Sequence, residues 1–585
     1  MYLEKITGPK DLKKMNAEER KILIEEMRRA LLKRASIHGG HVGPDLGFVE
    51  AAVALHTVFN SPKDKIVYDV SHQSYPHKML TGRQLAYTDE SHYDDVSGYT
   101  NPEESEHDFF NIGHTSTSIP LASGLAKARD LRGGKENIIA VLGDGSLSGG
   151  MAFEGLDTVG EMGTNFIVLF NDNDMSIAEN HGGIYRGIRK LRETNGQAED
   201  NLFRAFGFDY RFVADGNDVE ALIKTLEEVK DIDHPVVVHM VTLKGKGYKP
   251  AETNKEAWHW HMPFDLETGK TKDHDSDVYG TATAELLLEE MKKDPKLVAM
   301  TAGVPGVMGF TPSRRKEAGS QFVDVGIAEE QGVSMASGLA KAGMHPVFAT
   351  MSTFFQRTYD QMSQDVAING NSATFLVFGG SMYSLNDVTH LCLFDSPFFS
   401  SIPNFTYLAP VTLDEYKAML KWAIHQESMP VAIRVPVPVY ENGSIYPVEA
   451  GNDEDWTHSV ITHKGKKVAL IGAGNFYGLS ELTAKELEKK GIDATVINPR
   501  NMSILDENLL NDLKKDHELV VTMEDGSISG GFGERVASFY GTADMKVMNF
   551  GLAKAFYDRY DYDELAEENH LTPELAAADI LKTLS

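Results

Sequence analysis

The sequence predicts an α/β protein with mostly parallel sheets, and three observations carry this prediction. Helix-like and strand-like patterns alternate along the whole chain, which is typical of parallel sheets covered by helices. Several strand-like runs are apolar and end in glycine-rich or polar loops. The chain has 585 residues, whereas one hydrophobic core stops growing near roughly 250 to 300 residues. We therefore expect three α/β domains.

The first predicted element is a helix that begins after Asn16. The run AEERKILIEEMRRALLKRA places Leu23, Met27 and Leu31 along one face. Glu19 stands three residues after Asn16, which is the spacing of a capping box. Farther on, the segments ENIIAVLGDGSLSGG and TNFIVLFNDN each predict a buried strand, the first over residues 138–142, and each strand ends in a loop able to carry chemistry.

Two polar stretches divide the chain into three predicted domains. Residues 265–277 are polar and contain glycine, and a helix pattern, TATAELLLEEMKKD, follows them. A second connection, ENGSIYPVEAGNDEDW, precedes the strand-like run KKVALIGAGN. The expected domains are residues 1–270, 278–440 and 455–585.

Composition narrows the function classes. The 86 acidic and 57 basic side chains give a formal charge of -29, which repels nucleic acid and anionic lipid. No stretch approaches the roughly 20 apolar residues that a membrane span requires, and the first residues lack an apolar signal core. The single cysteine, Cys392, can form no intrachain disulfide. We expect a cytoplasmic protein that binds neither nucleic acid nor membranes.

The strongest local signal is Gly143-Asp144-Gly145 followed by Asn171-Asp172-Asn173, with Asn173 29 positions after Asp144. Because the carboxyl ends of parallel strands meet at one sheet edge, these side chains should lie close together. Their oxygens suit an octahedral Mg²⁺ whose remaining ligands come from a diphosphate and water, and the glycines let backbone N–H groups approach phosphate. The alternative is a pair of ordinary strand-end turns.

These motifs resemble the thiamine diphosphate fingerprint, and their neighbours resemble the 1-deoxy-D-xylulose 5-phosphate synthase family of the transketolase superfamily. The matching segments are GGHVGPDLGFVEAAVALH, YDVSHQSYPHKMLTGR, GHTSTS, GDGSLSGGMAFEGL, NDNDMSI, KGKGYKPAE, DVGIAEEQGV and STFFQRTYDQ. The resemblance implies a transketolase-like fold with a cofactor-diphosphate domain, a pyrimidine-binding domain and a C-terminal domain. It also implies thiamine diphosphate and Mg²⁺ as cofactors, a homodimer whose cofactor lies between the first two domains, and a role in isoprenoid biosynthesis.

The resemblance assigns the cofactor contacts residue by residue. Asp144, Asn173 and the Met175 carbonyl would hold Mg²⁺. The residues expected around the diphosphate or thiazolium are His72, Gly113, His114, Ser116, Gly145 and Ser146. Ile177 would be an apolar wedge that keeps the cofactor bent. Each of these residues taken alone could be a packing residue, but as a set they predict a site.

The resemblance also makes Glu329 the catalytic glutamate, hydrogen-bonded to the pyrimidine ring of the cofactor, and Phe354 the ring that stacks on that pyrimidine. Apolar surroundings would raise the pKa of Glu329. The adjacent Glu330 is the competing assignment, and for either residue the alternative is a solvated acid at a helix start.

Histidines offer proton transfer near neutral pH, and His41, His72, His259 and His390 match family histidines. His261 forms a His-x-His pair with His259, but two histidines without a third ligand are weak evidence for zinc, and we reject a zinc site there.

The residues expected to bind the acceptor aldehyde differ from those of the family. Arg357 and Arg434 are retained as candidate substrate contacts. A family arginine that helps hold the substrate phosphate is replaced by Gly379, and a second arginine, three positions after Arg434, by Val437. The other substituted positions are Asn386 for an aspartate, Met351 for a tyrosine and Ser71 for a glycine. Because these losses are concentrated in the predicted acceptor-binding part of the site, they suggest a changed acceptor substrate more than a loss of catalytic activity.

Three hypotheses follow. In the first, the enzyme decarboxylates pyruvate and joins the two-carbon unit to glyceraldehyde 3-phosphate or a related aldehyde. In the second, a ketose phosphate is the donor, as in transketolases. In the third, the protein binds thiamine diphosphate without catalysis, which retention of Glu329 and of the metal motif disfavours.

Overall fold

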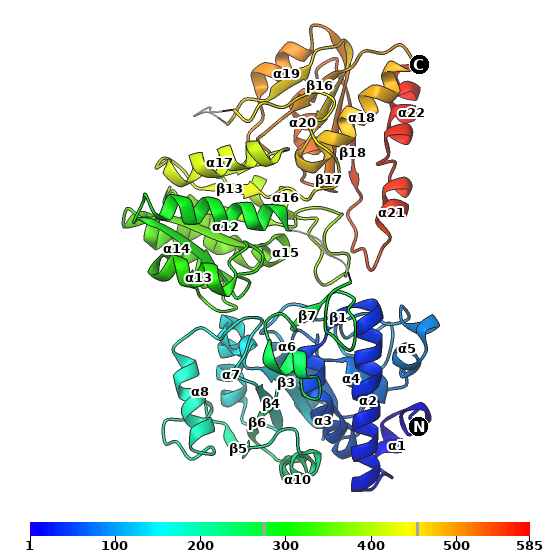
Figure 1. Cartoon of the computed structure of the whole chain (residues 1–585), viewed down its shortest axis with the longest axis vertical. Coiled ribbons are helices and arrows are strands. Elements are labelled where there is room, and N and C mark those ends of the chain that lie inside the picture. The colour runs from blue at the N-terminus through cyan, green and yellow to red at the C-terminus, as the bar shows by residue number, and fades with distance from the viewer. Residues whose placement is uncertain (273–276, 452–455) are drawn as a thin grey trace. The chain divides into compact units, whose positions relative to one another are not determined.

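The computed structural model describes residues 1–272, 277–451 and 456–585. The chain divides into two compact units (Figure 1). The first comprises Met1–Ser276 with Gly326–Ala328, and the second comprises Asp277–Val325 with Glu329–Ser585. Each unit is described by itself below.

The first unit is built on a five-stranded sheet in which every neighbouring pair is parallel. In sheet order its strands are β2 (Lys65–Tyr68), β3 (Ile138–Gly143), β4 (Phe166–Asp172), β6 (Pro235–Val241) and β5 (Asp209–Val213). The two predicted strands are β3 and β4, and they pair directly, with Gly143 opposite Asn171. Their carboxyl ends therefore lie side by side, as the sequence predicts.

Helices cover both faces of this sheet, which explains why β3 and the first five residues of β4 are apolar. Ile139 and Val141 pack into a core with α2 (Ala17–His38), α3 (Gly43–Val58) and α10 (Val219–Val229). Ile138 and Ala140 pack into a second core with α6 (Ser118–Arg132) and α7 (Gly150–Met162). Complete burial of each large aliphatic side chain contributes roughly 1.5 to 3 kcal/mol. The helix predicted after Asn16 is α2, and its capping box with Glu19 is confirmed.

A two-stranded antiparallel ribbon joins distant parts of the first unit. Its strands are β1 (Gly40–His41) and β7 (Trp260–His261), and His41 pairs with Trp260. This register brings the segments that carry His41 and His259 next to each other.

The second unit contains two sheets. The six-stranded sheet is parallel throughout, in the order β12 (Thr406–Leu408), β13 (Val431–Arg434), β11 (Thr374–Phe378), β10 (His345–Met351), β8 (Leu297–Thr301) and β9 (Phe322–Asp324). The five-stranded sheet has one antiparallel edge strand, in the order β14 (Val460–His463), β16 (Thr495–Asn498), β15 (Lys467–Gly472), β17 (His517–Ser527) and β18 (Lys546–Leu552). The main helices are α12 (Val278–Met291), α14 (Glu329–Lys341), α17 (Leu413–His425), α18 (Tyr477–Glu488), α20 (Phe532–Tyr540) and α22 (Pro573–Leu584).

The two sheets of the second unit share a hydrophobic core. Phe375 and Phe348 of the six-stranded sheet belong to the same buried cluster as Ile471 and Val520 of the five-stranded sheet. The segment after residue 440 is also packed, because Glu481 on α18 accepts hydrogen bonds from three of its backbone N–H groups. These contacts make the two sheets one compact unit.

The prediction of an α/β fold with mostly parallel sheets is confirmed. Within the described residues, every helix is too short or too polar to cross a membrane.

Candidate functional site

The carboxyl edge of the first unit's sheet carries the predicted metal ligands. Asp144 follows β3, and its Oδ2 accepts hydrogen bonds from the Met175 N–H at 3.0 Å and from Asn180 Nδ2 at 2.7 Å. The hydroxyl of Tyr185 donates to the Asp144 carbonyl at 2.8 Å. The Asp144 carboxylate is therefore held at the loop that carries Asn173 and Met175.

This edge fits a divalent cation. Asp144 is 1% exposed, and burial, reinforced by the nearby Asp172 carboxylate, raises the pKa of Asp144 to about 7. Asn173 Oδ1 is buried, and no donor among the described residues bonds to it. A bound cation would satisfy this oxygen and favour the ionised form of Asp144. The available donors are hard oxygens, as Mg²⁺ prefers.

A buried hydrogen-bond network that the sequence analysis missed holds the end of β4 next to this edge. Asp172, the last residue of β4, accepts hydrogen bonds from Arg192 at 2.7 Å and from His239 Nε2 at 2.9 Å. Burial opposes ionisation, but these hydrogen bonds lower the pKa of Asp172. His239 Nδ1 lies 2.7 Å from the Tyr210 hydroxyl, which fixes the imidazole on its other side. The sequence analysis placed Asp172 only in the polar motif after the strand, and no local pattern indicated its partners Arg192 and His239.

The loops expected around the diphosphate approach one another closely. Ser116, at φ +72°, donates from Oγ to the Ser146 carbonyl at 2.7 Å. A Cβ on Gly145 would lie 2.8 Å from Ser176 Oγ, so this position needs glycine. Asp69, which the sequence analysis missed, accepts the backbone N–H groups of Ser116 and Ser118. Of the other predicted contacts, Gly113 is buried, while His114 and Ile177 are partly exposed.

Three of the predicted histidines gather in one cluster. The ring centroid of His41 lies 5.0 Å from that of His72 and 5.5 Å from that of His259, and the His72–His259 distance is 5.1 Å. Lys244 Nζ lies 3.0 Å from His259 Nδ1 and donates to the Ser176 carbonyl at 2.5 Å. Lys244 lies in the quoted segment KGKGYKPAE, yet the sequence analysis gave it no role.

Burial sets the charge states of this cluster. It lowers the pKa of Lys244 to about 7, although Asp144 opposes the shift. Burial, together with the neighbouring Lys244, holds the pKa of His259 well below its usual range. The cluster therefore contains a neutral imidazole and an amine able to change protonation near neutral pH. His261 is separate from it, because its ring stacks on Trp258.

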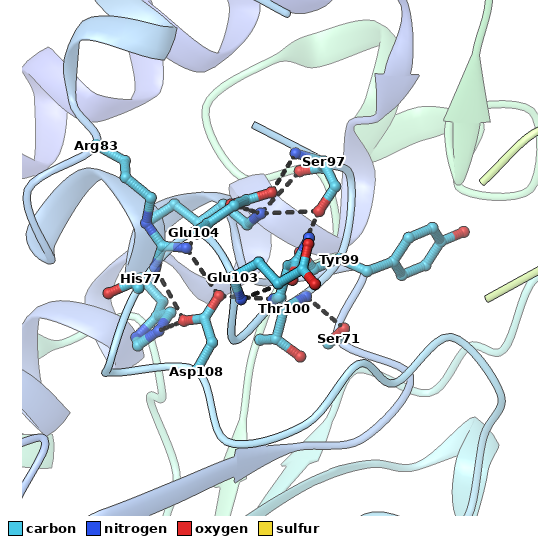
Figure 2. Close-up of polar contacts among 12 residues, drawn as sticks. Ser71, His77, Arg83, Ser97, Tyr99, Thr100, Glu103, Glu104 and Asp108 are labelled. Carbon is cyan, nitrogen blue, oxygen red and sulfur yellow. Dashed lines mark hydrogen bonds and ion pairs between the residues drawn. The ribbon is translucent and has the colours of Figure 1, made fainter. Parts of the chain in front are cut away.

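A buried ionic network holds the loop beside these histidines (Figure 2). Asp108 accepts hydrogen bonds from Arg83 at 2.7 Å and from the Asn101 N–H at 2.8 Å, and lies 2.8 Å from His77 Nε2. Figure 2 shows the Tyr99 ring pointing away from this network, and its centroid lies 5.9 Å from that of His41. The network therefore anchors the loop from which Tyr99 reaches the histidine cluster.

Ser71, which replaces a family glycine, connects three loops. Its hydroxyl donates to the Ile112 carbonyl at 2.5 Å and accepts the Thr100 N–H at 2.9 Å. Ser71 precedes His72 and has φ +61°, a left-handed conformation that is unfavourable for serine. The two hydrogen bonds offset this cost and join the loops next to His72, Tyr99 and Gly113.

In the second unit, Glu329 is the buried member of the Glu329–Glu330 pair. It begins α14, is 2% exposed, and its Oε2 lies 3.6 Å from Arg357 Nη1. Burial raises the pKa of Glu329 to about 7, although Arg357 opposes the shift. Glu330 is partly exposed. The structure thus gives Glu329 the environment expected of a carboxyl that shares a proton near neutral pH.

Phe354 and His390 lie together in the second unit. Phe354 belongs to α15 (Ser352–Phe355), and its ring meets that of His390 edge-on, with the centroids 5.8 Å apart. Burial lowers the pKa of His390 to about 4, so its imidazole is neutral at physiological pH. Thr389 Oγ1 lies 2.8 Å from His390 Nδ1 and orients the ring.

The loop 379–392 is held by a segment from the five-stranded sheet that the sequence analysis missed. Asn386 Nδ2 donates to the Tyr560 carbonyl at 2.9 Å, and the Arg559 N–H donates to the Asn386 carbonyl at 2.6 Å. The Tyr562 hydroxyl donates to the Ser384 carbonyl at 2.6 Å. Asn386, which stands for a family aspartate, therefore serves as an anchor between two loops.

Gly379 has adopted a conformation that its family counterpart could not share without change. Its φ is +72°, and a Cβ would lie 2.7 Å from both Met351 Cε and Ser384 Oγ. Restoring an arginine at this position alone would therefore strain the loop.

Arg434 is engaged in buried ion pairs rather than pointing toward a ligand. It is 2% exposed, donates from Nε to Asp395 at 2.7 Å, and pairs through Nη1 with Asp525. Asp525 lies on β17 and Arg434 on β13, so these pairs tie the two sheets together. The geometry favours a structural role over the substrate contact that the resemblance implies.

Fold and site together define an α/β protein with an oxygen-rich strand edge, a histidine cluster and a buried glutamate. Residues 3–199 and 194–242 match the family model of 1-deoxy-D-xylulose-5-phosphate synthase. Residues 278–442 match the transketolase pyrimidine binding domain, and residues 458–575 match the transketolase C-terminal domain.

Full-length relatives agree with these matches. A 1-deoxy-D-xylulose-5-phosphate synthase from Symbiobacterium thermophilum is 38% identical, with 98% of this chain and 94% of the relative covered. One from Chlorobaculum tepidum is 37% identical, with 99% and 98% covered. A solved transketolase from Pichia stipitis is 17% identical with a TM-score of 0.43, over 96% of this chain and 97% of that chain. The chain belongs to the 1-deoxy-D-xylulose-5-phosphate synthase family.

Proposed function

We propose that the protein is a thiamine diphosphate-dependent transferase that decarboxylates pyruvate and joins the two-carbon unit to an aldehyde, either glyceraldehyde 3-phosphate or a related acceptor. The observation that carries the proposal is the buried Asn173 Oδ1, which accepts no hydrogen bond from the residues that the structure describes, together with the buried Asp144 carboxylate; these oxygens suit a metal that binds a diphosphate. The names of the family relatives support the reaction class.

The first unit would hold the diphosphate end of the cofactor. Asp144, Asn173 and the Met175 carbonyl would bind Mg²⁺. The residues that would line the diphosphate or thiazolium are His72, Gly113, His114, Ser116, Gly145, Ser146 and Ile177. When bound, thiamine diphosphate supplies an acidic carbon that adds to a carbonyl group and then stabilises the charge left by loss of CO₂.

Glu329 would hydrogen-bond the pyrimidine ring, and Phe354 would pack against that ring. A carboxyl whose pKa is about 7 holds its proton in part of the population at neutral pH, so it can share that proton with a ring nitrogen. Arg357, 3.6 Å away, keeps the carboxylate form accessible.

The histidine cluster would handle protons at the substrate carbonyl. Neutral His259 beside Lys244 provides an acceptor next to a donor, and His41 and His72 contact the same ring. His390 is neutral as well and would hydrogen-bond the acceptor. Arg357 is the retained cation that would orient an anionic substrate.

The assembly and location are also proposed. The resemblance supports a homodimer, which sedimentation at micromolar concentration would test. The single buried cysteine, Cys392, and the net charge of -29 support a cytoplasmic protein that binds neither membranes nor nucleic acid.

Products identify the reaction. The protein with Mg²⁺ and thiamine diphosphate is incubated with pyruvate and matched phosphorylated and unphosphorylated aldehydes, while CO₂ and products are measured. We expect CO₂ release that depends on the aldehyde, with a 1-deoxyketose product. Turnover of a ketose phosphate without CO₂ would instead establish the transketolase-type reaction.

The rate at which the thiazolium C2 proton of bound cofactor exchanges with deuterium distinguishes the proposed enzyme from a protein that binds thiamine diphosphate without catalysis. Glu329→Gln should slow this exchange by about 10²- to 10⁴-fold, the usual contribution of a positioned acid or base, while Glu330→Gln should leave it nearly unchanged. Bound cofactor that exchanges no faster in the wild type than in Glu329→Gln would identify a binding protein.

A further inference from the structure

A second cluster of metal-ligating side chains lies in the second unit, at the amino ends of the six-stranded sheet. Asp294 follows α12, His345 is the first residue of β10, and His425 is the last residue of α17. One ligand atom from each residue lies within 4.8 Å of the others, and among the described residues this is the group of three His, Cys, Asp or Glu side chains that meets this spacing. The candidate ligands thus come from three separate segments.

We propose that Asp294, His345 and His425 form a binding site for a divalent transition-metal ion of the zinc class. Two imidazoles with carboxylates are the donors that such ions select, whereas Mg²⁺ and Ca²⁺ prefer oxygen ligands throughout. A water molecule would complete a four-coordinate shell around the three protein ligands. Glu290 lies beside the cluster, with Oε2 3.2 Å from His425 Nε2, and its carboxylate adds negative charge that favours a cation there.

The surrounding contacts already orient most of these groups. His345 Nδ1 lies 2.6 Å from Asp294 Oδ2, while Asp294 Oδ1 accepts the Lys296 N–H at 2.9 Å. The other carboxylate oxygen of Glu290 accepts from Lys293 Nζ at 3.1 Å, which leaves Oε2 facing the cluster. Side-chain exposure is 15% for Asp294 and His345 and 8% for Glu290. Two of the three ligands, Asp294 and His345, are therefore held in place before a metal arrives.

His425 is the adjustable ligand and the route of entry. Its side chain is 44% exposed. Ligands bound at 2.0 to 2.1 Å in a tetrahedron lie about 3.4 Å apart, and the three ligand atoms here lie within 4.8 Å of one another. His425 is the ligand that would adjust to the ion, because it is the most exposed of the three. The carboxyl-terminal ends of α12 and α17 both lie at the site and favour a cation there.

The alternative is a set of ordinary ion pairs in which protonated histidines neutralise the carboxylates. His345 Nε2 lies 3.9 Å from Glu427, and Lys293 already pairs with Glu289 and Glu290. Ion pairs and a metal site differ in measurable ways, because only a metal site binds zinc with defined stoichiometry and stabilises the fold when zinc is added.

The test uses the full chain, freed of transition metals and saturated with Mg²⁺ and thiamine diphosphate, so that zinc cannot occupy a cofactor metal site. Zinc is titrated against a chromophoric chelator, and cobalt(II) is added separately to record visible absorption. We expect one zinc equivalent per chain and intense cobalt bands typical of four-coordination. His345→Gln and His425→Gln should each weaken zinc binding by at least about tenfold, and the double variant should lose the cobalt bands.

His463→Gln is the matched control, because His463 also pairs with a carboxylate, Asp493, at 2.6 Å and lies in the five-stranded sheet. It should bind zinc as the wild type does. Zinc should raise the melting temperature of the wild type and of the control but not that of the double variant. If the double variant does not fold, His425→Gln alone suffices, since this side chain is largely exposed. Equal zinc affinity and stoichiometry in the wild type and His425→Gln would overturn the proposal.

Discussion

The strand edge that carries Asp144 and Asn173 and the loop 379–392 that carries Gly379 and Asn386 differ in how far they depart from the family. The edge keeps the resembled motif, and Asp172, Arg192 and His239 support it from behind. The loop has Gly379 in place of one expected arginine, and the segment 558–562 fastens it through Asn386. The contrast teaches that the strand edge is constrained by a buried ionic network, whereas the loop is held by a few hydrogen bonds of partly exposed residues.

Energetics explain why the loop could change. A charge-assisted hydrogen bond to a substrate is worth roughly 1.5 to 3 kcal/mol, and its loss affects binding without unfolding the protein. Loss of the Asp172 carboxylate would instead remove the buried anion that faces both Arg192 and His239, leaving Arg192 with Asp174 and His239 with Tyr210. We therefore expect substitutions at the edge to cost more stability than substitutions in the loop.

The largest expected effect lies at the strand edge. Because outer-shell partners alone are worth about 10- to 100-fold in metal affinity, Asp144→Ala should weaken Mg²⁺-dependent cofactor binding by more than about 100-fold. Calorimetric titration of thiamine diphosphate at fixed Mg²⁺ measures this. Asp200→Ala, which removes an exposed carboxylate paired with Lys190, is the control and should bind normally. Unchanged affinity in Asp144→Ala would remove the edge from the cofactor site.

The next effect concerns the two positions where an expected arginine is missing, Gly379 in the loop and Val437 after β13. Val437→Arg restores the second expected arginine at a partly exposed position and should lower KM for a phosphorylated aldehyde by about 10- to 100-fold. Gly379→Arg should not help, because its Cβ would crowd Met351 and Ser384. KM for the unphosphorylated aldehyde should stay constant in both variants. An equal gain for both aldehydes would argue against a lost phosphate anchor.

A smaller effect tests whether the pKa of the buried Glu329 carboxyl lies near neutral pH. Burial raises the pKa of Glu329 from 4.5 to about 7, so the contribution of this one group to stability is fully present below pH 4.5 and is lost as pH rises through 7. In cofactor-free protein, the stability of Glu329→Gln relative to the wild type should therefore rise by about 2 kcal/mol between pH 5.5 and pH 8. Urea unfolding of both proteins at the two pH values measures this difference. Glu330→Gln should show no such rise, and an equal stability difference between Glu329→Gln and the wild type at both pH values would mean that the Glu329 carboxyl has an ordinary pKa.

The smallest effect is at Ser71. Ser71→Ala removes the two hydrogen bonds but keeps the left-handed backbone, whereas Ser71→Gly removes the bonds and relieves about 1 kcal/mol of backbone cost. Ser71→Ala should therefore be less stable than Ser71→Gly by about 1 kcal/mol in urea unfolding. Equal stability of the two variants would mean that the loop relaxes and that Ser71 bears no backbone strain.

Local patterns were enough for much of the fold and for part of the site. The capping box of α2, the buried strands β3 and β4, and the adjacency of Asp144 and Asn173 follow from short-range sequence and from the geometry of parallel strands. The resemblance singled out His41, His72 and His259 as candidate site residues, but only the structure showed that they gather in one cluster, because residues so far apart carry no common local signal.

The sequence by itself determined the class of fold and the strand-end motif, because these depend on periodicity and spacing within a few tens of residues, and its matching segments carried the resemblance to the family. Only the tertiary structure showed that Arg434 forms ion pairs with Asp395 and Asp525. It also showed that Lys244 lies next to His259 and that residues 558–562 hold Asn386 by hydrogen bonds. Such partners are distant in sequence, and burial then sets their charge. Neither can be read from the chain before its packing is known.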